Sequence, residues 1–445
     1  MAASRLPYPS SRWFAPANLF AAGLFCLVAA QFFGSKFLAA GQILVFGGIV
    51  GTLWQKGRSS LEWRRWGASA KCLAAFLGIA LLSLVGNRSV IADPLDHLEK
   101  LRVFPLLLLI PAMPALVGKN LGVPWRRDSL VLAWLIPMGL AILAGVCSWI
   151  AGESLFLGET RGGPDRISGF YGQVMTFANC LQFTVVALAV LVFLPGLWRS
   201  LTRLPRWVAI ASLIMAAGGL YLTYTRGAML GAAVGLLIFG AMRSRKLLIA
   251  FLAVGLGVAV FSYFEGSRYL ALKTDPRINH WRAAALASLE RPVLGWGYRN
   301  FELQSAKLKE RYGFPKDVSW KGGKRLPPSH LQRHAHNNYL EAFASTGMFG
   351  GIAFLAFCFC WMREARSSGQ AVVFVPLIAA FFVSGLFENT FFDAEVLNCI
   401  LLVWLFSQWT FAKEALAGIK PGQADRKAPF REALPPNPGP NRHLK

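Results

Sequence analysis

The sequence predicts an all-α, polytopic integral membrane protein, and two observations lead to that prediction. Of the 445 residues, 55% are hydrophobic and only 15% are charged, which is too apolar for a soluble domain of ordinary composition. The apolar residues also fall in long runs. A helix that crosses the hydrocarbon core needs roughly 20 apolar residues, and the chain supplies about twelve such runs. The expected spans are residues 14–34, 37–54, 68–86, 101–118, 129–151, 170–195, 206–224, 227–242, 246–264, 338–361, 371–388 and 394–412.

The basic residues predict the orientation of these spans. The formal net charge is +24, and short basic segments follow every second span, for example Arg64 and Arg65 after the second and Arg126 and Arg127 after the fourth. By the positive-inside rule these loops and both termini lie in the cytoplasm. The charge sits in short loops rather than in a compact basic domain, so nucleic acid is not an expected partner.

The cysteines predict no metal or redox chemistry. All seven lie inside apolar segments, and the sequence contains no CxxC pair or metal-ligand spacing. Neither a disulfide framework nor a zinc site is therefore indicated. No acidic cluster suited to Mg²⁺ stands in the external loops. We expect neither a metal nor a cofactor.

Four segments follow from the span pattern. Residues 1–264 hold the first nine spans, the first of which is expected to be retained rather than cleaved. Residues 265–335 form one large external loop with short amphipathic helices, broken at Pro292 and at the Gly295-Trp296-Gly297 turn. Residues 336–415 hold the last three spans, and residues 416–445 form a disordered basic cytoplasmic tail.

Two histidines stand directly before the tenth span, in Arg333-His334-Ala335-His336-Asn337-Asn338-Tyr339. Imidazole titrates nearest neutrality, so a histidine at the membrane edge is a candidate for proton transfer. The alternative is that His334 and His336 are interfacial polar residues, with Asn337 or Asn338 capping the helix.

Four external arginines form the second candidate group: Arg161 and Arg166 before the sixth span, Arg226 in the turn before the eighth, and Arg282 in the large loop. Guanidinium groups are permanently charged and planar, which suits a pyrophosphate held without a metal. The alternative is that each extends to lipid headgroups or pairs with a nearby acid. The acids considered are Asp165, Glu265, Glu290 and Glu388.

These motifs together resemble the O-antigen ligase and polymerase superfamily of bacterial envelopes, and O-antigen ligases most closely. The resemblance rests on Thr-Arg-Gly opening one span, on "RPVLGWGYRNF" in the large loop, and on "HAHNNYLEAFASTGMFG". The most specific element is the spacing of His336, Asn337, Gly347 and Gly350. The resemblance covers most of spans six to ten, whereas the first five spans resemble the family only in their general apolar character. The segment after Arg166 departs from the family, because relatives often have a Pro-Asn pair there.

The resemblance implies an inverting, metal-independent glycosyltransferase of the inner membrane with a periplasmic active site. It would move a glycan from undecaprenyl pyrophosphate to a sugar hydroxyl of lipid A-core. By this resemblance His336 is the general base, and Arg226 and Arg282 bind the pyrophosphate and stabilise its departure. Arg166 or Arg161 assists, with Asn337, His334 and Tyr339 in support.

Other functions fit the same sequence features. A polymerase of the superfamily would lengthen the glycan on its carrier, and a protein O-oligosaccharyltransferase would use a protein acceptor. A transporter of lipid-linked glycan would use the arginines as an anion site. Transporters usually show internal repeats and polar groups near the bilayer midplane, whereas the polar groups here gather at one edge.

Overall fold

The computed structural model is built from helices, as predicted. It describes residues 16–33, 35–56, 66–91, 93, 97, 127–152, 166–264, 277–317, 320–321, 324–325 and 327–404. Among these residues, six helices are long and apolar enough to cross a membrane: Ala68–Gly86, Asp128–Ala151, Val174–Phe193, Arg203–Leu222, Arg226–Arg243 and Asn338–Ser367. The chain is thus an all-α, polytopic membrane protein, and the number of its spans stays a prediction.

The helices before the large loop agree closely with the predicted spans. They are α1 (Pro16–Ala30), α2 (Ser35–Lys56), α3 (Ala68–Gly86), α7 (Arg127–Ala151), α8 (Val174–Phe193), the short α9 (Pro195–Arg199), α10 (Arg203–Leu222), α11 (Arg226–Arg243) and α12 (Arg245–Phe264). The predicted span 101–118 lies outside the described residues.

The large loop contains two short helices, α13 (Arg277–Glu290) and α14 (Phe301–Arg311). Two short antiparallel strands follow, β1 (Trp320–Lys321) and β2 (Lys324–Arg325). The chain then enters α15 (Asn338–Ser367), α16 (Ala371–Ser384), the 3-10 turn η5 (Thr390–Phe392) and a last apolar helix, Ala394–Trp404. The predicted cytoplasmic tail, 416–445, lies outside the described residues.

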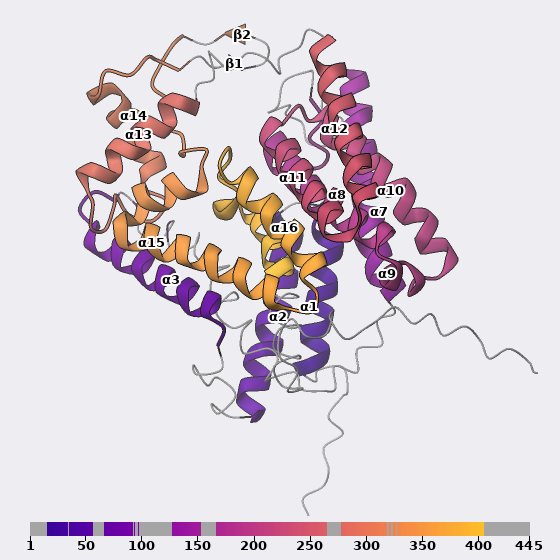
Figure 1. Cartoon of the computed structure of the whole chain (residues 1–445). Coiled ribbons are helices and arrows are strands. Elements are labelled where there is room, and N and C mark those ends of the chain that lie inside the picture. The colour runs from indigo at the N-terminus through magenta and orange to yellow at the C-terminus, as the bar shows by residue number, and fades with distance from the viewer. Residues whose placement is uncertain are drawn as a thin grey trace, which may run out of the picture.

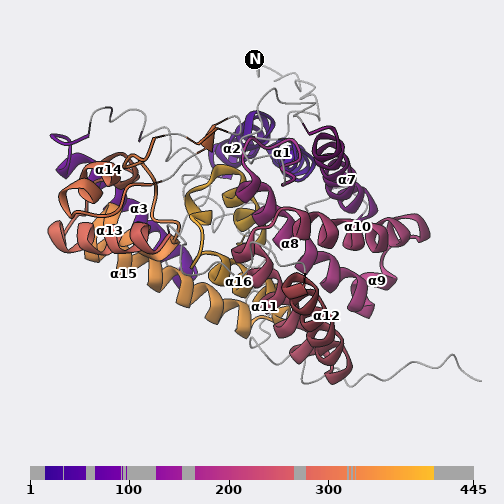
Figure 2. The ribbon, with the colours of Figure 1, turned by 90° about the horizontal axis from the view of Figure 1, so that it is seen from above.

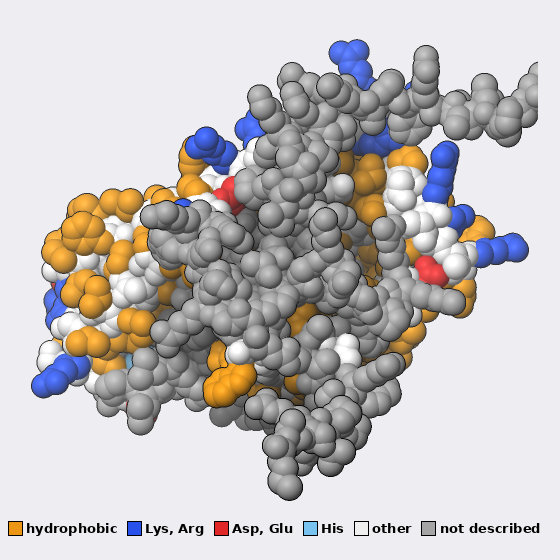
Figure 3. Space-filling view, turned by 90° about the horizontal axis from the view of Figure 1, so that it is seen from below, with side chains coloured by type: hydrophobic (Ala, Val, Ile, Leu, Met, Phe, Trp, Pro, Cys, Tyr) orange, Lys and Arg blue, Asp and Glu red, His pale blue; other side chains and the backbone are white. Residues whose placement is uncertain are grey.

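The helices form two groups joined by α16. On one side α15 lies along α3, with α13 and α14 beside them; on the other lie α7, α8, α10, α11 and α12 (Figures 1 and 2). Helix α8 is buried along most of its length among these helices. Hydrophobic side chains cover much of the described surface seen from below, and Lys and Arg stand mainly at its margins (Figure 3). This distribution suits a protein surrounded by lipid.

Two glycines explain how the large loop joins the helical body. Helix α15 is kinked at Gly347, which has φ 71°, and Gly295 of the loop has φ 62°. A Cβ on Gly347 would lie 2.3 Å from the Val293 carbonyl oxygen. The backbone of the loop hydrogen-bonds into the kink, from Trp296 N to the Ala344 oxygen (2.9 Å) and from Met348 N to the Pro292 oxygen (2.7 Å). Only glycine permits this positive-φ, close approach of two backbones.

Candidate active site

The segment that ends at His336 is held in place from both sides. The Ala335 N–H donates to the Glu341 carboxylate at 2.9 Å, and the Trp281 indole N–H donates to the His336 carbonyl at 3.4 Å. His336 itself has φ 50°, an uncommon conformation for a residue other than glycine. Such conformations persist where the surroundings hold them, and they occur often at functional sites.

Asn337 is the residue that caps α15. Its side-chain oxygen accepts hydrogen bonds from the N–H groups of Tyr339 (2.9 Å) and Leu340 (3.0 Å). This cap satisfies two of the free donors at the helix start. The prediction that Asn337 caps the helix is therefore confirmed. This cap is compatible with a catalytic role for His336, because the cap uses the Asn337 side chain and leaves the His336 imidazole to contact Glu388.

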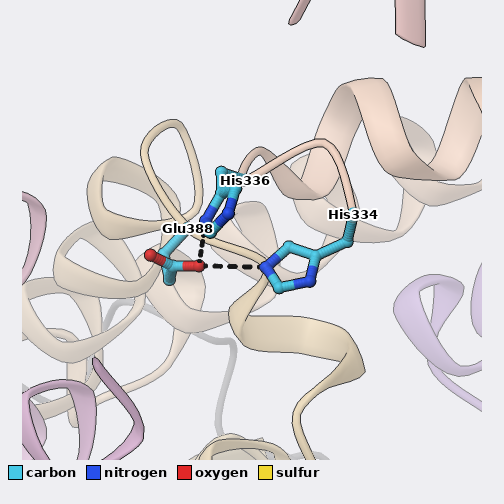
Figure 4. A group of neighbouring side chains, drawn as sticks. All are labelled: His334, His336 and Glu388. Atoms are coloured by element: carbon cyan, nitrogen blue, oxygen red, sulfur yellow. Dashed lines mark hydrogen bonds and ion pairs between the residues drawn. The ribbon is translucent and has the colours of Figure 1, made fainter. Parts of the chain in front are cut away.

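The carboxylate of Glu388 joins the two predicted histidines. Its Oε1 lies 2.7 Å from His336 Nδ1 and 3.2 Å from His334 Nε2 (Figure 4). Its Oε2 lies 3.5 Å from the Arg277 guanidinium. The His334 and His336 rings are 4.1 Å apart, centroid to centroid. The site is therefore a buried imidazole oriented by a carboxylate, with a second imidazole and a guanidinium beside it.

The two asparagines at the start of α15 position the loop that carries Glu388. Asn338 N donates to the Gly385 oxygen at 2.7 Å, and the Asn337 side chain donates to the Leu386 oxygen at 3.0 Å. The Asn338 side chain also accepts from Phe391 N at 2.9 Å. The run of amides after His336 thus fixes the 385–391 loop against α15, and with it the carboxylate that meets His336.

Burial and charge set different protonation states for these groups. Burial is the main cause that lowers the pKa of His336 below its ordinary value, against the opposing effect of Glu388. Burial also disfavours a charge on His334, but its interactions with the carboxylates of Glu302 and Glu388 prevail and raise its pKa to about 10. Burial works against ionisation of Glu388, yet His336 and His334 hold its pKa well below the usual range. At neutral pH the site combines a neutral His336 with an ionised Glu388 and a protonated His334.

A second cluster of buried polar side chains, formed by His280, Lys309 and Asp317, lies next to His336. The His280 ring of α13 lies 5.5 Å from the His336 ring, and its Nδ1 lies 3.4 Å from Lys309 Nζ. Lys309 Nζ is 2.5 Å from the Asp317 carboxylate. Burial and the Lys309 charge lower the pKa of His280 to about 3, so it is neutral. This group ties α13 to α14 behind His336.

Two of the predicted arginines meet at the turn before α11. Arg166 Nε donates to the Thr223 carbonyl at 2.6 Å, and its NH2 donates to Thr225 Oγ1 at 2.8 Å. Arg226, half-buried, is the first residue of α11 and directly follows this turn. Arg161 lies outside the described residues. Of Arg161 and Arg166, Arg166 is therefore the one that the structure places beside the turn before Arg226.

Phe387 connects this turn with α13 and the histidines. A Cβ on Gly227, next to Arg226, would lie 2.8 Å from Phe387 Cβ. The Phe387 ring also lies 6.3 Å from the ring of Trp281, next to Arg282. The residue after Phe387 is Glu388. The backbones that carry Arg226, Arg282 and His336 are thus gathered around one short loop, although the Arg282 side chain is exposed on α13.

Sequence reasoning gave no site role to three residues that the structure brings to His336, namely Glu388, Arg277 and His280. Glu388 was considered only as an ion-pair partner for external arginines, and it does pair with an arginine, Arg277. The signal that could have identified it is an acid placed directly after an apolar helix, on the side of the membrane where the histidines were expected. Tyr339, a predicted supporting residue, donates from its hydroxyl to the Phe382 oxygen at 3.0 Å and packs α15 on α16.

The donor set of this site is also compatible with a metal ion. His334, His336 and Glu388 each offer one ligand atom, and the three atoms lie within 4.8 Å of one another. Two imidazoles and a carboxylate suit Zn²⁺. The sequence-based prediction that no metal takes part therefore stays a prediction, and a chelator can test it.

Comparison with known proteins found a match over part of the chain. Residues 210–355 match a family model described as O-Antigen ligase. The match covers less than half of the chain, and within that segment the chain is similar to O-antigen ligases. The predicted resemblance to that superfamily is confirmed, and the match runs from α10 into α15, through Arg226, Arg282 and His336. Glu388 follows the matched segment. No curated protein matched the chain.

The apolar helices and the matched segment together indicate a multi-pass membrane protein with a segment similar to O-antigen ligases. The matched segment contains the candidate base, and the loop after α16 adds its carboxylate partner.

Proposed function

We propose that this protein is an O-antigen ligase. It transfers O-antigen polysaccharide from undecaprenyl pyrophosphate to a sugar hydroxyl of lipid A-core and so completes lipopolysaccharide. The reaction inverts the anomeric centre and uses no metal or cofactor. The observation that carries this proposal is the His336–Glu388 pair, 2.7 Å from Nδ1 to Oε1, in which His336 lies inside the segment that matches the O-antigen ligase model and Glu388 follows it.

His336 acts as the general base on the acceptor. With Nδ1–H donating to Glu388, the imidazole is held in the tautomer that leaves Nε2 free to accept a proton. The acceptor hydroxyl loses its proton to Nε2 as its oxygen attacks the anomeric carbon. Because burial keeps His336 neutral, the base is available at neutral pH. Base assistance of this kind typically contributes about 10²- to 10⁴-fold to the rate.

Guanidinium groups compensate the charge on the departing pyrophosphate. The bond from the anomeric carbon to the phosphate oxygen breaks with its electrons on that oxygen, so negative charge develops at the leaving group. In this proposal Arg226 meets the pyrophosphate, and Arg166 or Arg161 assists. Arg282, which the sequence also predicts for this role, is exposed on the outward face of α13. Arg277, which the structure places at Glu388, adds a further positive charge. Fixed cations at a developing negative charge stabilise the transition state without reorganising.

The membrane geometry of the proposal follows from the basic loops. The protein lies in the inner membrane with both termini in the cytoplasm, by the positive-inside rule. His334, His336 and Glu388 then belong to the periplasmic side, where a completed lipid-linked glycan and lipid A-core would meet. A polymerase of the same superfamily is the nearest alternative, because the match supports the ligase and polymerase superfamily without separating the two reactions.

The test is transfer by purified protein in proteoliposomes, with lipid-linked glycan as donor and lipid A-core as acceptor. The variant is His336→Ala, and its matched control is His330→Ala in the same loop. We expect about a 10²- to 10⁴-fold loss of rate for the first variant and near wild-type rate for the control. Undiminished transfer by His336→Ala at equal protein level would refute the base assignment. Lengthening of the donor without consumption of the acceptor would instead identify a polymerase.

A further inference from the structure

Helix α13 has two faces of different character. The buried face carries His280, Ala283, Ala284 and Ala287, against α14 and α15. The outward face carries Ile278, Arg282, Ala285 and Leu289, spaced four, three and four residues apart, all of them exposed. Residues at this spacing line one side of a helix. Ile278 is 41% exposed and Leu289 is 75% exposed.

The outward face continues into the lipid-facing surface of α15. Val293, three residues after α13, is 57% exposed, and its carbonyl lies against Gly347 at the kink of α15. Residues 338–347 are buried or half-buried, whereas exposed apolar side chains begin at once after the kink. They are Met348, Phe349, Ile352, Leu355 and Phe359. The exposed apolar surface of α15 therefore begins at about the same depth in the membrane as Leu289 and Val293.

We propose that α13 lies on the outer surface of the membrane, with Ile278, Ala285, Leu289 and Val293 among the lipid chains and Arg282 at the headgroup phosphates. A helix that carries apolar side chains and a basic residue on its outward face can lie in the plane of the membrane surface. The aliphatic part of an arginine packs along apolar surface while its guanidinium reaches the phosphates. The partner is the membrane itself, through anionic phospholipids.

This placement has a consequence for the histidines. The inner face of α13 presents His280 to His336, with ring centroids 5.5 Å apart. The half-buried Trp281, on the flank of α13, donates to the His336 carbonyl. A helix anchored on the membrane surface by its outer face therefore holds the candidate base just above the lipid headgroups. The inference goes beyond the proposed function and does not depend on it, since it concerns where α13 sits rather than what His336 does.

The test uses the full-length protein in vesicles that contain no lipid-linked glycan. A fluorescent coumarin amino acid is introduced singly at Leu289, at Phe359 as a lipid-facing reference, and at Lys307 of α14, an exposed residue of the same loop, as the reference expected in water. Nitroxide lipids report contact with lipid, and iodide reports contact with water. We expect the probe at position 289 to be quenched by nitroxide placed near the headgroup and shielded from iodide, with the opposite result at position 307. Iodide quenching at position 289 equal to that at position 307 would overturn the proposal.

The role of Arg282 is tested with the same probe at position 289. We expect addition of phosphatidylglycerol to phosphatidylcholine vesicles to increase nitroxide quenching for the native arginine and for Arg282→Lys, but not for Arg282→Glu. An equal response of the three proteins to phosphatidylglycerol would refute the contact of Arg282 with headgroup phosphates. Because no glycan or acceptor is present, neither result depends on whether the protein is a ligase.

Discussion

The replacement Glu388→Gln isolates the contribution of the carboxylate to the candidate base. Glutamine has nearly the same shape, but its amide carries no charge and can donate a hydrogen bond to Nδ1 of His336. It would then stabilise the tautomer with the proton on Nε2, where the acceptor proton has to go. In a Ser-His-Asp triad the equivalent Asp→Asn change lowers kcat by about 10⁴. The 2.7 Å contact of Glu388 with His336 is comparable, although His334 and Arg277 share the carboxylate. We therefore expect a loss of about 10²- to 10⁴-fold, or roughly 3–5 kcal/mol of transition-state stabilisation.

The pH profile distinguishes this effect from simple unfolding. The base works only when neutral, so the rate falls as the pH drops through the pKa of His336. Burial lowers that pKa, which places the acid limb of the wild-type profile below about pH 6.5, the ordinary value for histidine. Glu388 acts to raise the pKa of His336, so its removal should move the acid limb to still lower pH while the plateau falls. The measurement is the initial rate of transfer to lipid A-core between pH 4 and pH 9.

Asp393→Asn is the matched control for Glu388→Gln. Asp393 lies near Glu388 in the chain and accepts from Thr176 Oγ1 and from the N–H groups at the start of the last helix, but it belongs to a different hydrogen-bond group from the histidines. The same change from carboxylate to amide there should leave the rate within a few-fold of wild type. A Glu388→Gln protein with a rate within threefold of wild type and an unchanged acid limb would refute the reasoning.

Three further predictions concern the fold and the chemistry. Gly347→Ala should destabilise the protein by at least about 2 kcal/mol, because it places a Cβ at positive φ and against backbone. Thermal unfolding in detergent measures this loss. The control Gly218→Ala, whose Cβ meets open space, should show no such loss. Oxidation with copper phenanthroline should join Cys72 of α3 to Cys360 of α15, whose sulfur atoms are 3.9 Å apart; absence of the linked peptide in mass spectrometry would contradict the packing of these two helices. Removal of metal ions with a chelator should leave transfer unchanged, since the base and the cations come from the chain; a loss of activity that Zn²⁺ restores would instead make the histidine cluster a metal centre.

Much of the fold could be predicted because the bilayer imposes a length on each apolar run. The predicted span 68–86 is α3 itself, and the predicted span 227–242 differs by one residue at each end from α11. The sequence also predicted that the large loop contains two short helices broken near Pro292. It could not predict how the loop meets α15, because the contact of Gly295 with Gly347 joins residues far apart in the chain, and hydropathy carries no information about such a contact.

The candidate site was only partly predictable for the same reason. His336 and Asn337 were accessible to sequence reasoning because both lie at the start of an apolar helix, where caps and interfacial groups are expected. Glu388 lies 52 residues from His336, and its partner Arg277 opens a helix whose orientation could not be determined from its weakly periodic sequence. The outward direction of Arg282 also depends on that orientation. Spatial partners across helices therefore needed the structure, whereas residues within one motif did not.

Burial is the main reason that His336 can remain a neutral base, and the neighbouring charges modify its effect. His336 lies at the start of α15, where the helix dipole disfavours an added positive charge. Arg277 and His334 have the same effect on its pKa. Glu388 acts in the opposite direction and keeps the ring oriented. Arg277 and His334 add to the effect of burial on the pKa of His336, and the same two cations would attract a departing pyrophosphate. Base strength and leaving-group stabilisation are therefore coupled here, and a substitution that removes Arg277 should raise the pKa of His336 while it weakens pyrophosphate binding.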